Sequence, residues 1–465
     1  NDEVRVSQGQ AYVVSGDVIT DAATGQAAKL PADAEDVVNN NYMRSVIDTA
    51  QAALALSSSD VAARRSAAEK LAAEPDAERL ALIDKALASE TDEQVKALLS
   101  RAKAASLLDS GDRQQRLQAV EQLAHAQTPE TQLVLNQRLA DEADPDVQKA
   151  IKAALAGIAE KLAWGERLGA AFSGISLGSV LLLAALGLAI TYGLMGVINM
   201  AHGELIMIGA YATYLVQIMF QRYLPEAAFG WYLVVSIPVA FLASALVGAV
   251  LERGVIRFLY GRPLETLLAT FGISLVLQQT VRSLFGAQNV GVENPAWMSG
   301  GIALLPNLTL PYNRIAIIVF AFAVLGAVAF MIAKTRLGLF VRGVTQNRAM
   351  ASCVGVNTAR TDTYAFALGS GIAGLAGCAL SQIGNVGPDL GQNYIVDSFL
   401  VVVLGGVGQL AGTVYAALGL GLLSKLLEGW TGAVLAKIAV LLFIVIFIQK
   451  RPQGIFALKG RSAEA

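Results

Sequence analysis

The sequence predicts an all-α polytopic membrane protein of about 8–9 transmembrane helices, some of them broken, with an N-terminal soluble α-helical repeat domain. Of the 465 residues, 54% are hydrophobic and 15% are charged, whereas soluble domains carry roughly 25% charged residues. The charge is also divided, with a net of −9 over residues 1–167 and +7 over residues 168–465. This division excludes a uniform α/β enzyme, a collagen-like chain and a disordered chain.

The amino-terminal part contains two kinds of pattern. Residues 1–39 form a first segment, in which 4–30 mix β-branched residues with turn signals, as in 12–19, and predict a hairpin. Residues 40–165 are rich in Ala, Leu and Glu with helical spacing. We therefore expect a helical domain over 40–165.

Eight residues of this helical domain recur 52 positions later. They are Asp60, Arg64, Leu71, Leu87, Ala88, Glu90, Asp92 and Val95, with the partners Asp112, Arg116, Leu123, Leu139, Ala140, Glu142, Asp144 and Val147. Each copy predicts three helices, at 60–73, 78–88 and 92–108 and at 112–124, 130–140 and 145–162, with Asp60 and Asp112 as N-caps. Two copies are typical of a small α-solenoid resembling HEAT or armadillo repeats. The alternative is a coincidental Ala/Leu-rich bundle.

Residues 168–457 form the expected membrane domain. Its apolar segments lie near 172–194, 203–221, 231–251, 264–285, 313–333, 361–381, 397–427 and 430–449. Several reach the roughly 20 residues that cross a bilayer as a helix. The segment 397–427 is too long for one span and contains several glycines, so it predicts a re-entrant half-helix plus a span, or two short spans.

Loop charges predict the orientation of the spans. The connections 252–263 and 334–360 contain arginines and are expected in the cytoplasm, whereas 286–310 and 382–396 contain neither Lys nor Arg. Counting back from these loops places the helical domain outside the cytoplasm, which requires a cleaved signal peptide. The tail 458–465 is expected in the cytoplasm. A chain that begins outside the cytoplasm and ends inside it crosses the membrane an odd number of times, which favours nine transmembrane passes over eight.

The connection after the first span carries Asn199, His202 and Glu204 between two apolar runs. Polar and ionisable side chains at membrane depth usually line a cavity or meet a partner. These three residues are therefore candidates for a translocation path or its gate. The alternative is a cytoplasmic turn whose side chains cap two helices.

Gly405, Gly406 and Gly408 are further candidates for the path, because interrupted helices often line transport routes. The alternative is close helix packing at small residues. Neither His125 nor His202 has a set of partners at metal-ligand spacing, and no nucleophile triad is evident. We expect no metal, no cofactor and no catalytic site.

The loop 334–360 is amphipathic and long for a membrane connection. Apolar residues such as Leu339 and Phe340 are mixed with Arg342 and Arg348, which is typical of a docking surface for a protein or of an interfacial helix on anionic lipid. The chain contains no G-x-x-x-x-G-K-[ST] motif, so ATP-driven work would depend on another chain.

Three ordered motifs resemble the permeases of branched-chain amino-acid type ABC importers. They are 193–204 (GLMGVINMAHGE) with 208–211 (IGAY), parts of 335–356 (TRLG, QNR and VGV), and 450–456 (KRPQGIF). The resemblance covers about 172–457. The helical extension and the sequence of residues 199–207 (NMAHGELIM) are similar to the urea-transport branch of that family.

The resemblance implies a multi-pass permease subunit in the bacterial inner membrane that translocates a small polar solute, with urea as the first expectation. It implies a periplasmic solute-binding protein, a second permease subunit and two cytoplasmic ABC ATPases as partners, with membrane lipid around it and no role for nucleic acid. The coupling loop is then 334–360, with these contacts: Arg336, Gly338, Arg342, Gln346, Asn347, Arg348 and Gly355. Gln346 and Asn347 are neutral where many relatives carry an acidic residue, which argues against a salt bridge to the ATPase there.

Three alternatives stay open at this point. The solute could be a branched-chain amino acid or a short amide. The chain could be a passive channel or a secondary transporter that needs no ATPase. Finally, the helical domain could be the main functional part, as a periplasmic scaffold or receptor that the membrane domain merely anchors.

Overall fold

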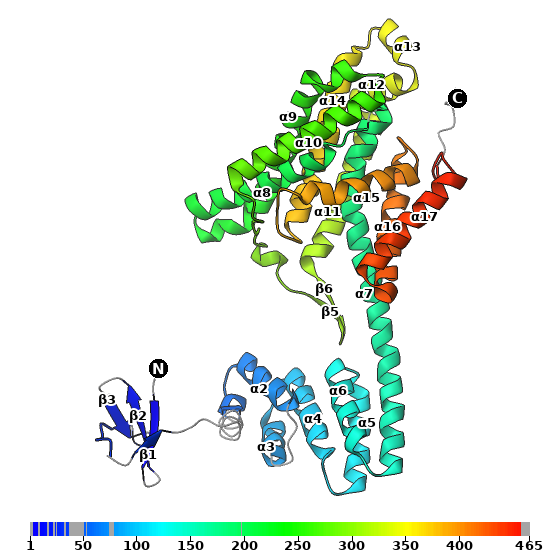
Figure 1. Cartoon of the computed structure of the whole chain (residues 1–465). Helices are drawn as coiled ribbons and strands as arrows, with labels where there is room; N and C mark the ends of the chain where they lie inside the picture. Colours follow the sequence, from blue (N-terminus) through cyan, green and yellow to red (C-terminus); the bar gives the residue numbers. More distant parts are fainter. Residues whose placement is uncertain are drawn as a thin grey trace. The chain divides into compact units, whose positions relative to one another are not determined.

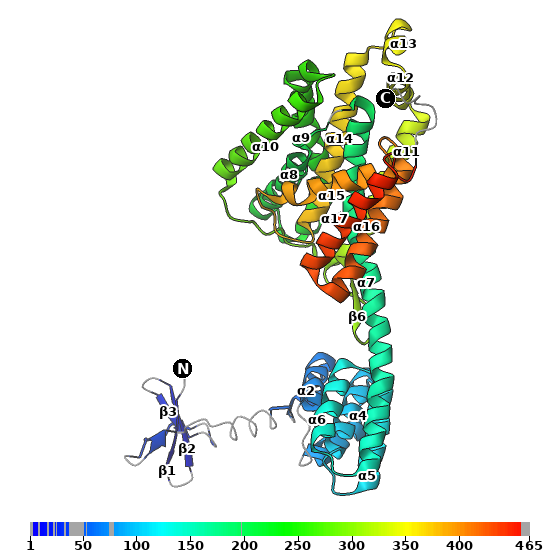
Figure 2. The ribbon, with the colours of Figure 1, turned by 45° about the vertical axis from the view of Figure 1, so that its right-hand side comes forward.

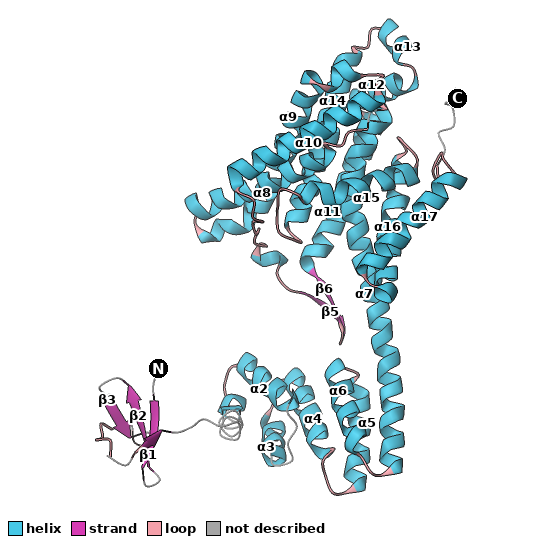
Figure 3. Ribbon diagram, in the orientation of Figure 1, coloured by secondary structure: helices cyan, strands magenta, loops and turns pink. Residues whose placement is uncertain are grey.

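The computed structural model describes residues 3–456, apart from 8–9, 16–17, 22–23, 25, 32–33, 37–50, 53, 74–78 and 197. It divides into two compact units, Asn1–Leu162 and Ala163–Ala465. Helices make up most of both units (Figure 1, Figure 3). The tail 458–465 and the start of the expected helical domain, 40–50, lie outside the described residues.

The first unit begins with a small antiparallel sheet in the order β3-β2-β1-β4. Its strands are β1 (Glu3–Ser7), β2 (Gln10–Ser15), β3 (Val18–Asp21) and β4 (Glu35–Asp36). The hairpin expected over 4–30 is instead three successive antiparallel strands: β1 pairs with β2, and β2 pairs with β3 from Tyr12↔Asp21 to Ser15↔Val18.

Then come the helices α2 (Val61–Ala73), α3 (Leu80–Ser89), α4 (Glu93–Leu107), α5 (Arg113–Ala126), α6 (Pro129–Asp141) and α7 (Pro145–Met195). Asp60 and Asp112 accept N-capping hydrogen bonds of 3.0 and 2.9 Å from Ala62 and Gln114. Only α7 departs strongly from the expected bounds. It continues past residue 162 because no proline or turn sequence interrupts it before Gly196, whose φ of 63° ends it.

Equivalent positions of the 52-residue repeat make the same polar contacts. Arg64 Nε lies 2.9 Å from Glu90 Oε2, and Glu90 Oε1 accepts from the N–H of Asp92. Asp92 in turn caps α4 by accepting from the N–H of Val95. The second copy has the corresponding contacts Arg116–Glu142, Glu142–Asp144 and Asp144–Val147. One apolar core lies around Leu71 in the first copy, and a second, around Leu123, also includes Ala104, Ala105 and Leu108 from the end of the first copy.

The second unit contains α8 (His202–Tyr223), η2 (Glu226–Trp231), α9 (Tyr232–Gly254), η3 (Ile256–Leu259), α10 (Pro263–Phe285), η4 (Ala296–Met298), β5 (Gly301–Leu305), β6 (Leu308–Pro311), α11 (Tyr312–Lys334), α12 (Arg336–Gln346), α13 (Arg348–Cys353), α14 (Thr358–Ser381), α15 (Leu390–Gly405), α16 (Leu410–Thr431) and α17 (Ala433–Lys450). Among the described residues, eight helices are long and apolar enough to cross a membrane: α7, α8, α9 together with η2, α10, α11, α14, α16 and α17.

The long apolar segment 397–427 is divided between two helices. The first, α15, ends at Gly405 and has 16 residues, which is short for a full span. The second, α16, begins at Leu410. The turn between them is tight, because a Cβ on Gly405 would lie 2.5 Å from the carbonyl carbon of Gly412.

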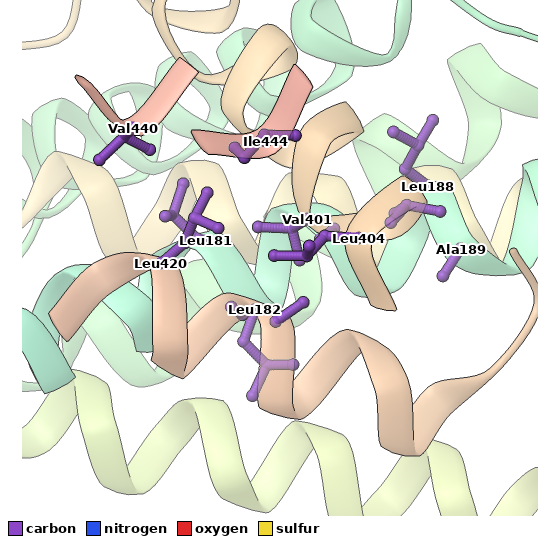
Figure 4. Close-up of a cluster of buried hydrophobic side chains, with 13 residues drawn as sticks. Leu181, Leu182, Leu188, Ala189, Val401, Leu404, Leu420, Val440 and Ile444 are labelled. Atoms are coloured by element: carbon purple, nitrogen blue, oxygen red, sulfur yellow. The ribbon is translucent and has the colours of Figure 1, made fainter. Parts of the chain in front are cut away.

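The centre of this unit is formed by α7 and α14. In the most apolar 18-residue stretch of each helix, 89% of the residues are buried in α7 and 83% in α14, against 17% in α11 and in α17. A helix that is apolar and covered on all sides belongs to a core. Around α7, Leu181, Leu182 and Leu188 pack against Val401, Leu404, Leu420, Val440 and Ile444 (Figure 4). On the other side, α8, α9 and α14 pack side by side (Figure 1, Figure 2).

Candidate functional site

The helix that carries His202 and Glu204 begins inside the bundle rather than at its edge. Leu205 O, in the first turn of α8, accepts a hydrogen bond of 2.9 Å from Ser244, halfway along α9. Glu204 accepts a hydrogen bond from Ser274, halfway along α10. Residues 198–201, which form no regular helix, therefore return from the end of α7 into the middle of the bundle. A helix that starts at this depth directs its positive dipole end to the interior, while the N–H groups of Ala201, His202 and Glu204 are already hydrogen-bonded to Asn199 and Ala201.

A second helix begins at the same place. A Cβ on Gly203, in the first turn of α8, would lie 2.7 Å from the carbonyl oxygen of Gly391, the second residue of α15. The two backbones are thus in direct contact, which only a pair of glycines permits. The first turns of α8 and α15 meet inside the second unit (Ala163–Ala465), which we call the membrane unit from here on. Transporters with broken helices use this arrangement at their solute sites.

Glu204 is the most distinctive side chain at this junction. It is fully buried, and its Oε1 accepts hydrogen bonds from Ser274 at 2.7 Å and from Gln278 at 2.8 Å. Its Oε2 has no hydrogen-bond partner among the described residues. A buried carboxylate oxygen with nothing to accept from is costly, so this oxygen is suited to receive an N–H or O–H group from a ligand.

The partners of Glu204 belong to a polar stripe along α10. Thr266, Thr270, Ser274 and Gln278 recur every four residues and are all buried, which places them on one face of the helix. Other positions of α10, such as Leu268, are widely exposed. This stripe was not among the predictions from the sequence. Its only signal is the four-residue spacing of small polar residues within an apolar run.

Asn199 lies beside the same stripe. Its Oδ1 accepts from the N–H of Ala201 at 3.0 Å, while the N–H of Met200 donates to Thr270 at 3.2 Å. The side chain is 2% exposed, and Nδ2 is without a hydrogen-bond partner in the part of the chain that the structure describes. Asn199 therefore closes a short turn just before α8, whose N-cap residue Ala201 has no side-chain cap, and keeps a buried donor without a partner among the described residues.

His202 faces another helix. Its Nε2 lies 3.1 Å from Ala184 O of α7, and because a carbonyl oxygen only accepts, Nε2 carries the proton. Residues two apart on a helix point about 200° apart, so His202 and Glu204 lie on opposite sides of α8. The structure brings Asn199 and Glu204 to the α10 stripe and places His202 against α7.

Gly405, Gly406 and Gly408 lie in the turn between α15 and α16. Gly406 and Gly408 have φ of 99° and 78°, values that glycine adopts most easily. A Cβ on Gly193, near the end of α7, would lie 2.6 Å from Gly408 Cα, and one on Gly454 would lie 2.7 Å from the nitrogen of Gly406. These contacts favour the packing alternative for the three glycines.

The loop 334–360 folds into the helix pair α12 and α13, which encloses a groove of about 580 Å³. The groove is lined by Leu339, Phe340, Gly343, Gln346, Asn347, Met350, Ala351, Val354 and Val356. Arg336 begins α12, and Arg342 is exposed on it. Because the groove lining is uncharged, a protein that docks there would bind through apolar contacts.

Three other residues predicted to contact an ATPase shape the helix pair. A Cβ on Gly338 would lie 2.6 Å from the carbonyl carbon of Ile332, so this glycine lets α12 pack onto the end of α11. Asn347 caps α13 by accepting from Met350 N–H at 2.9 Å. Gly355, with φ of 88°, makes the turn towards α14.

Arg348, the last of the seven predicted contacts to be described, forms an ion pair within the chain. Its guanidinium binds Asp362 of α14, whose side chain is fully buried. The arginine is thus paired within the chain, with an aspartate fourteen residues away that no local sequence pattern indicated.

Comparison with known proteins identifies the membrane unit. The family described as the branched-chain amino acid transport system permease component matches residues 170–449. The permease LivH of Escherichia coli K12, described as part of a high-affinity branched-chain amino acid transport system, is 27% identical over 293 residues, covering 61% of this chain and 93% of LivH. BraD of Pseudomonas aeruginosa is 27% identical with the same coverage, and a probable LivH of Methanocaldococcus jannaschii is 24% identical, covering 60% of this chain and 88% of that protein.

No solved structure matches the chain. The family match leaves the first 169 residues uncovered, so the amino-terminal unit is an addition to the part shared with these permeases. The eight candidate spans agree with a multi-pass protein of the inner membrane, and the relatives are transport subunits rather than enzymes. From residue 170 onwards, the chain belongs to the family of branched-chain amino acid type ABC transporter permeases.

Proposed function

We propose that this chain is the permease subunit of an ABC importer and that its solute binds at the junction of α8, α10 and α15. The observation that carries the proposal is Glu204, a fully buried carboxylate with one free oxygen at the meeting point of two helix N-termini. Membrane-embedded ionisable groups of this kind mark transport paths.

Urea is our first candidate for the solute. Urea carries N–H donors that suit Glu204 Oε2 and a carbonyl acceptor that suits Asn199 Nδ2. The amino-terminal extension, which the family match does not cover, also supports a specialised branch. Branched-chain amino acids are the second candidate, because the relatives LivH and BraD are named for their transport.

The proposed partners follow from the importer class. Two cytoplasmic ATPases would dock at the α12–α13 groove, a second permease subunit would complete the membrane pathway, and a periplasmic binding protein would deliver the solute. We propose further that the 52-residue repeats form a HEAT- or armadillo-like domain outside the cytoplasm. Nine passes, with α15 as the shortest, would then leave the carboxyl end in the cytoplasm.

The proposal is tested by reconstituting the permease with its ATPases and binding protein in liposomes. We expect uptake of labelled urea that requires ATP and stops when the ATPase is inactivated. Preference of the binding protein for leucine over urea would assign the second candidate. Uptake that persists without ATP would contradict the importer and favour a channel or a secondary transporter.

The role of the amino-terminal unit is tested by deleting residues 1–160. We expect reduced uptake with normal membrane insertion, since helical repeat domains usually bind partners. Unchanged uptake would show that the domain is accessory. Loss of a periplasmic binding activity without any change in transport would favour the scaffold alternative.

A further inference from the structure

A cluster of polar side chains connects the α12–α13 pair to the helices that surround the proposed solute site; Glu252, Asp362 and Thr363 are buried, whereas Arg348 is exposed on one side. Arg348, the first residue of α13, binds the buried carboxylate of Asp362 on α14. The same guanidinium lies 5.1 Å from the centre of the Tyr260 ring, after η3. Arg348 is thus held by charge and by stacking at once.

The cluster continues from Tyr260 to α9. The Tyr260 hydroxyl donates to Glu252 Oε1 at 3.1 Å, and Thr363 of α14 donates to Glu252 Oε2 at 2.6 Å. Glu252 is fully buried, and Arg257 Nε lies 3.7 Å from its Oε1. Burial raises the pKa of Tyr260 above its usual range, so the hydroxyl remains a donor. The cluster of Arg348, Asp362, Tyr260, Glu252 and Thr363 therefore joins α13, α9 and α14.

Beyond this cluster, α14 packs backbone to backbone against α8, the helix that carries Glu204. A Cβ on Gly377 of α14 would lie 2.7 Å from the backbone nitrogen of Ala210, and one on Gly369 would lie 2.6 Å from Thr191 of α7. Close-packed helices of this kind move as blocks because no long side chain can adjust between them. A displacement at the carboxylate of Asp362 would thus reach α8 and its first turn.

On the basis of the proposed function, we propose that the Arg348–Asp362 pair, supported by Tyr260 and Glu252, is the joint that passes ATPase-driven movement of the α12–α13 pair to α14. Arg348 and Asp362 are positioning residues that touch neither solute nor ATP. The apolar groove then holds the ATPase, while the ion pair transmits its movement. The two tasks are divided between neighbouring residues of one loop.

The test is the number of solute molecules imported per ATP hydrolysed by the complete transporter in liposomes. Arg348→Gln and Asp362→Asn should each lower this ratio by about tenfold, within the usual range of coupling effects, while ATPase subunits still co-purify. The double variant Arg348→Asp with Asp362→Arg should recover most of the ratio. Arg360→Gln, an exposed arginine on the first turn of α14, is the control and should retain the wild-type ratio.

Should Asp362→Asn fail to assemble, Arg348→Lys carries the same test, because it keeps the charge but loses the forked geometry that binds a carboxylate. An unchanged ratio in assembled single variants would overturn the inference and leave the importer assignment intact. Uptake and ATP hydrolysis that fall in proportion would also overturn it, since the pair would then only hold the loop in place. A wild-type transporter without ATP-dependent uptake would overturn the proposed function itself.

Discussion

Replacing Gly203 by alanine tests whether the first turns of α8 and α15 meet as the structure indicates. The added Cβ would lie 2.7 Å from the carbonyl oxygen of Gly391, where ordinary contacts begin at 3.4 Å. Because that oxygen belongs to a backbone, no rotamer change relieves the contact, and the helices must separate by about 0.7 Å. Forced separations in close-packed cores cost about 1–3 kcal/mol.

The matched control is Gly419→Ala in the middle of α16, where a Cβ would meet nothing within 4 Å. Alanine gains up to about 1 kcal/mol of helix propensity at Gly419 in the helix interior and less at Gly203 in the first turn of α8, so the difference between the variants contains this term together with the steric cost. We expect the apparent unfolding temperature of purified Gly203→Ala to lie roughly 2–10 °C below that of Gly419→Ala, with lower uptake in liposomes. Equal unfolding temperatures and equal uptake would refute the contact between α8 and α15.

Three further predictions concern the solute site, the helical unit and the groove. Glu204→Gln should reduce uptake by roughly tenfold or more, because a hydrogen bond to a charged group is worth about 1.5–3 kcal/mol. The control Glu226→Gln changes an exposed residue and should transport normally. Equal uptake by the two variants would exclude Glu204 from the path. The hydrogen bond from Arg64 lowers the pKa of Glu90 from 4.5 to about 2, so its stabilising effect should be present above about pH 4.5 and disappear as the pH falls towards 2. Hydrogen exchange of α3 and α4, corrected for intrinsic rates, should show this loss in the wild type and not in Glu90→Gln. Finally, Met350→Asp should release the ATPases during purification by placing a charge in the apolar groove, and retained binding would place their contact elsewhere.

The sequence predicted the order of helices well because hydropathy and capping are local signals. Asp60 and Asp112 cap their helices as expected, and the apolar runs after Trp164 recur as spans. The beginning of α15 was less predictable, since Gln392, Asn393 and Asp397 lower the hydropathy of its first half. The helix therefore starts at Leu390 instead of 397.

The candidate site was only partly predictable, because proximity in the sequence differs from proximity on a helix. His202 and Glu204 are neighbours in the motif, yet the helical period turns them to α7 and α10. The partners Ser274 and Gln278 are seventy or more residues away and are ordinary polar residues in an apolar run. Only tertiary structure joins them to Glu204.

Among the described residues of the second unit, three carboxylates are fully buried, those of Glu204, Glu252 and Asp362, and they differ in their partners. Asp362 is paired with Arg348, and Glu252 has Arg257 at 3.7 Å. Glu204 receives only neutral donors from the described residues, and one of its oxygens receives none. Burying a charge is unfavourable unless an opposite charge and hydrogen bonds compensate for it. The two compensated carboxylates can hold helices together at rest, whereas the unpartnered oxygen of Glu204 is what we expect if this side chain has the place in the solute path that we propose for it.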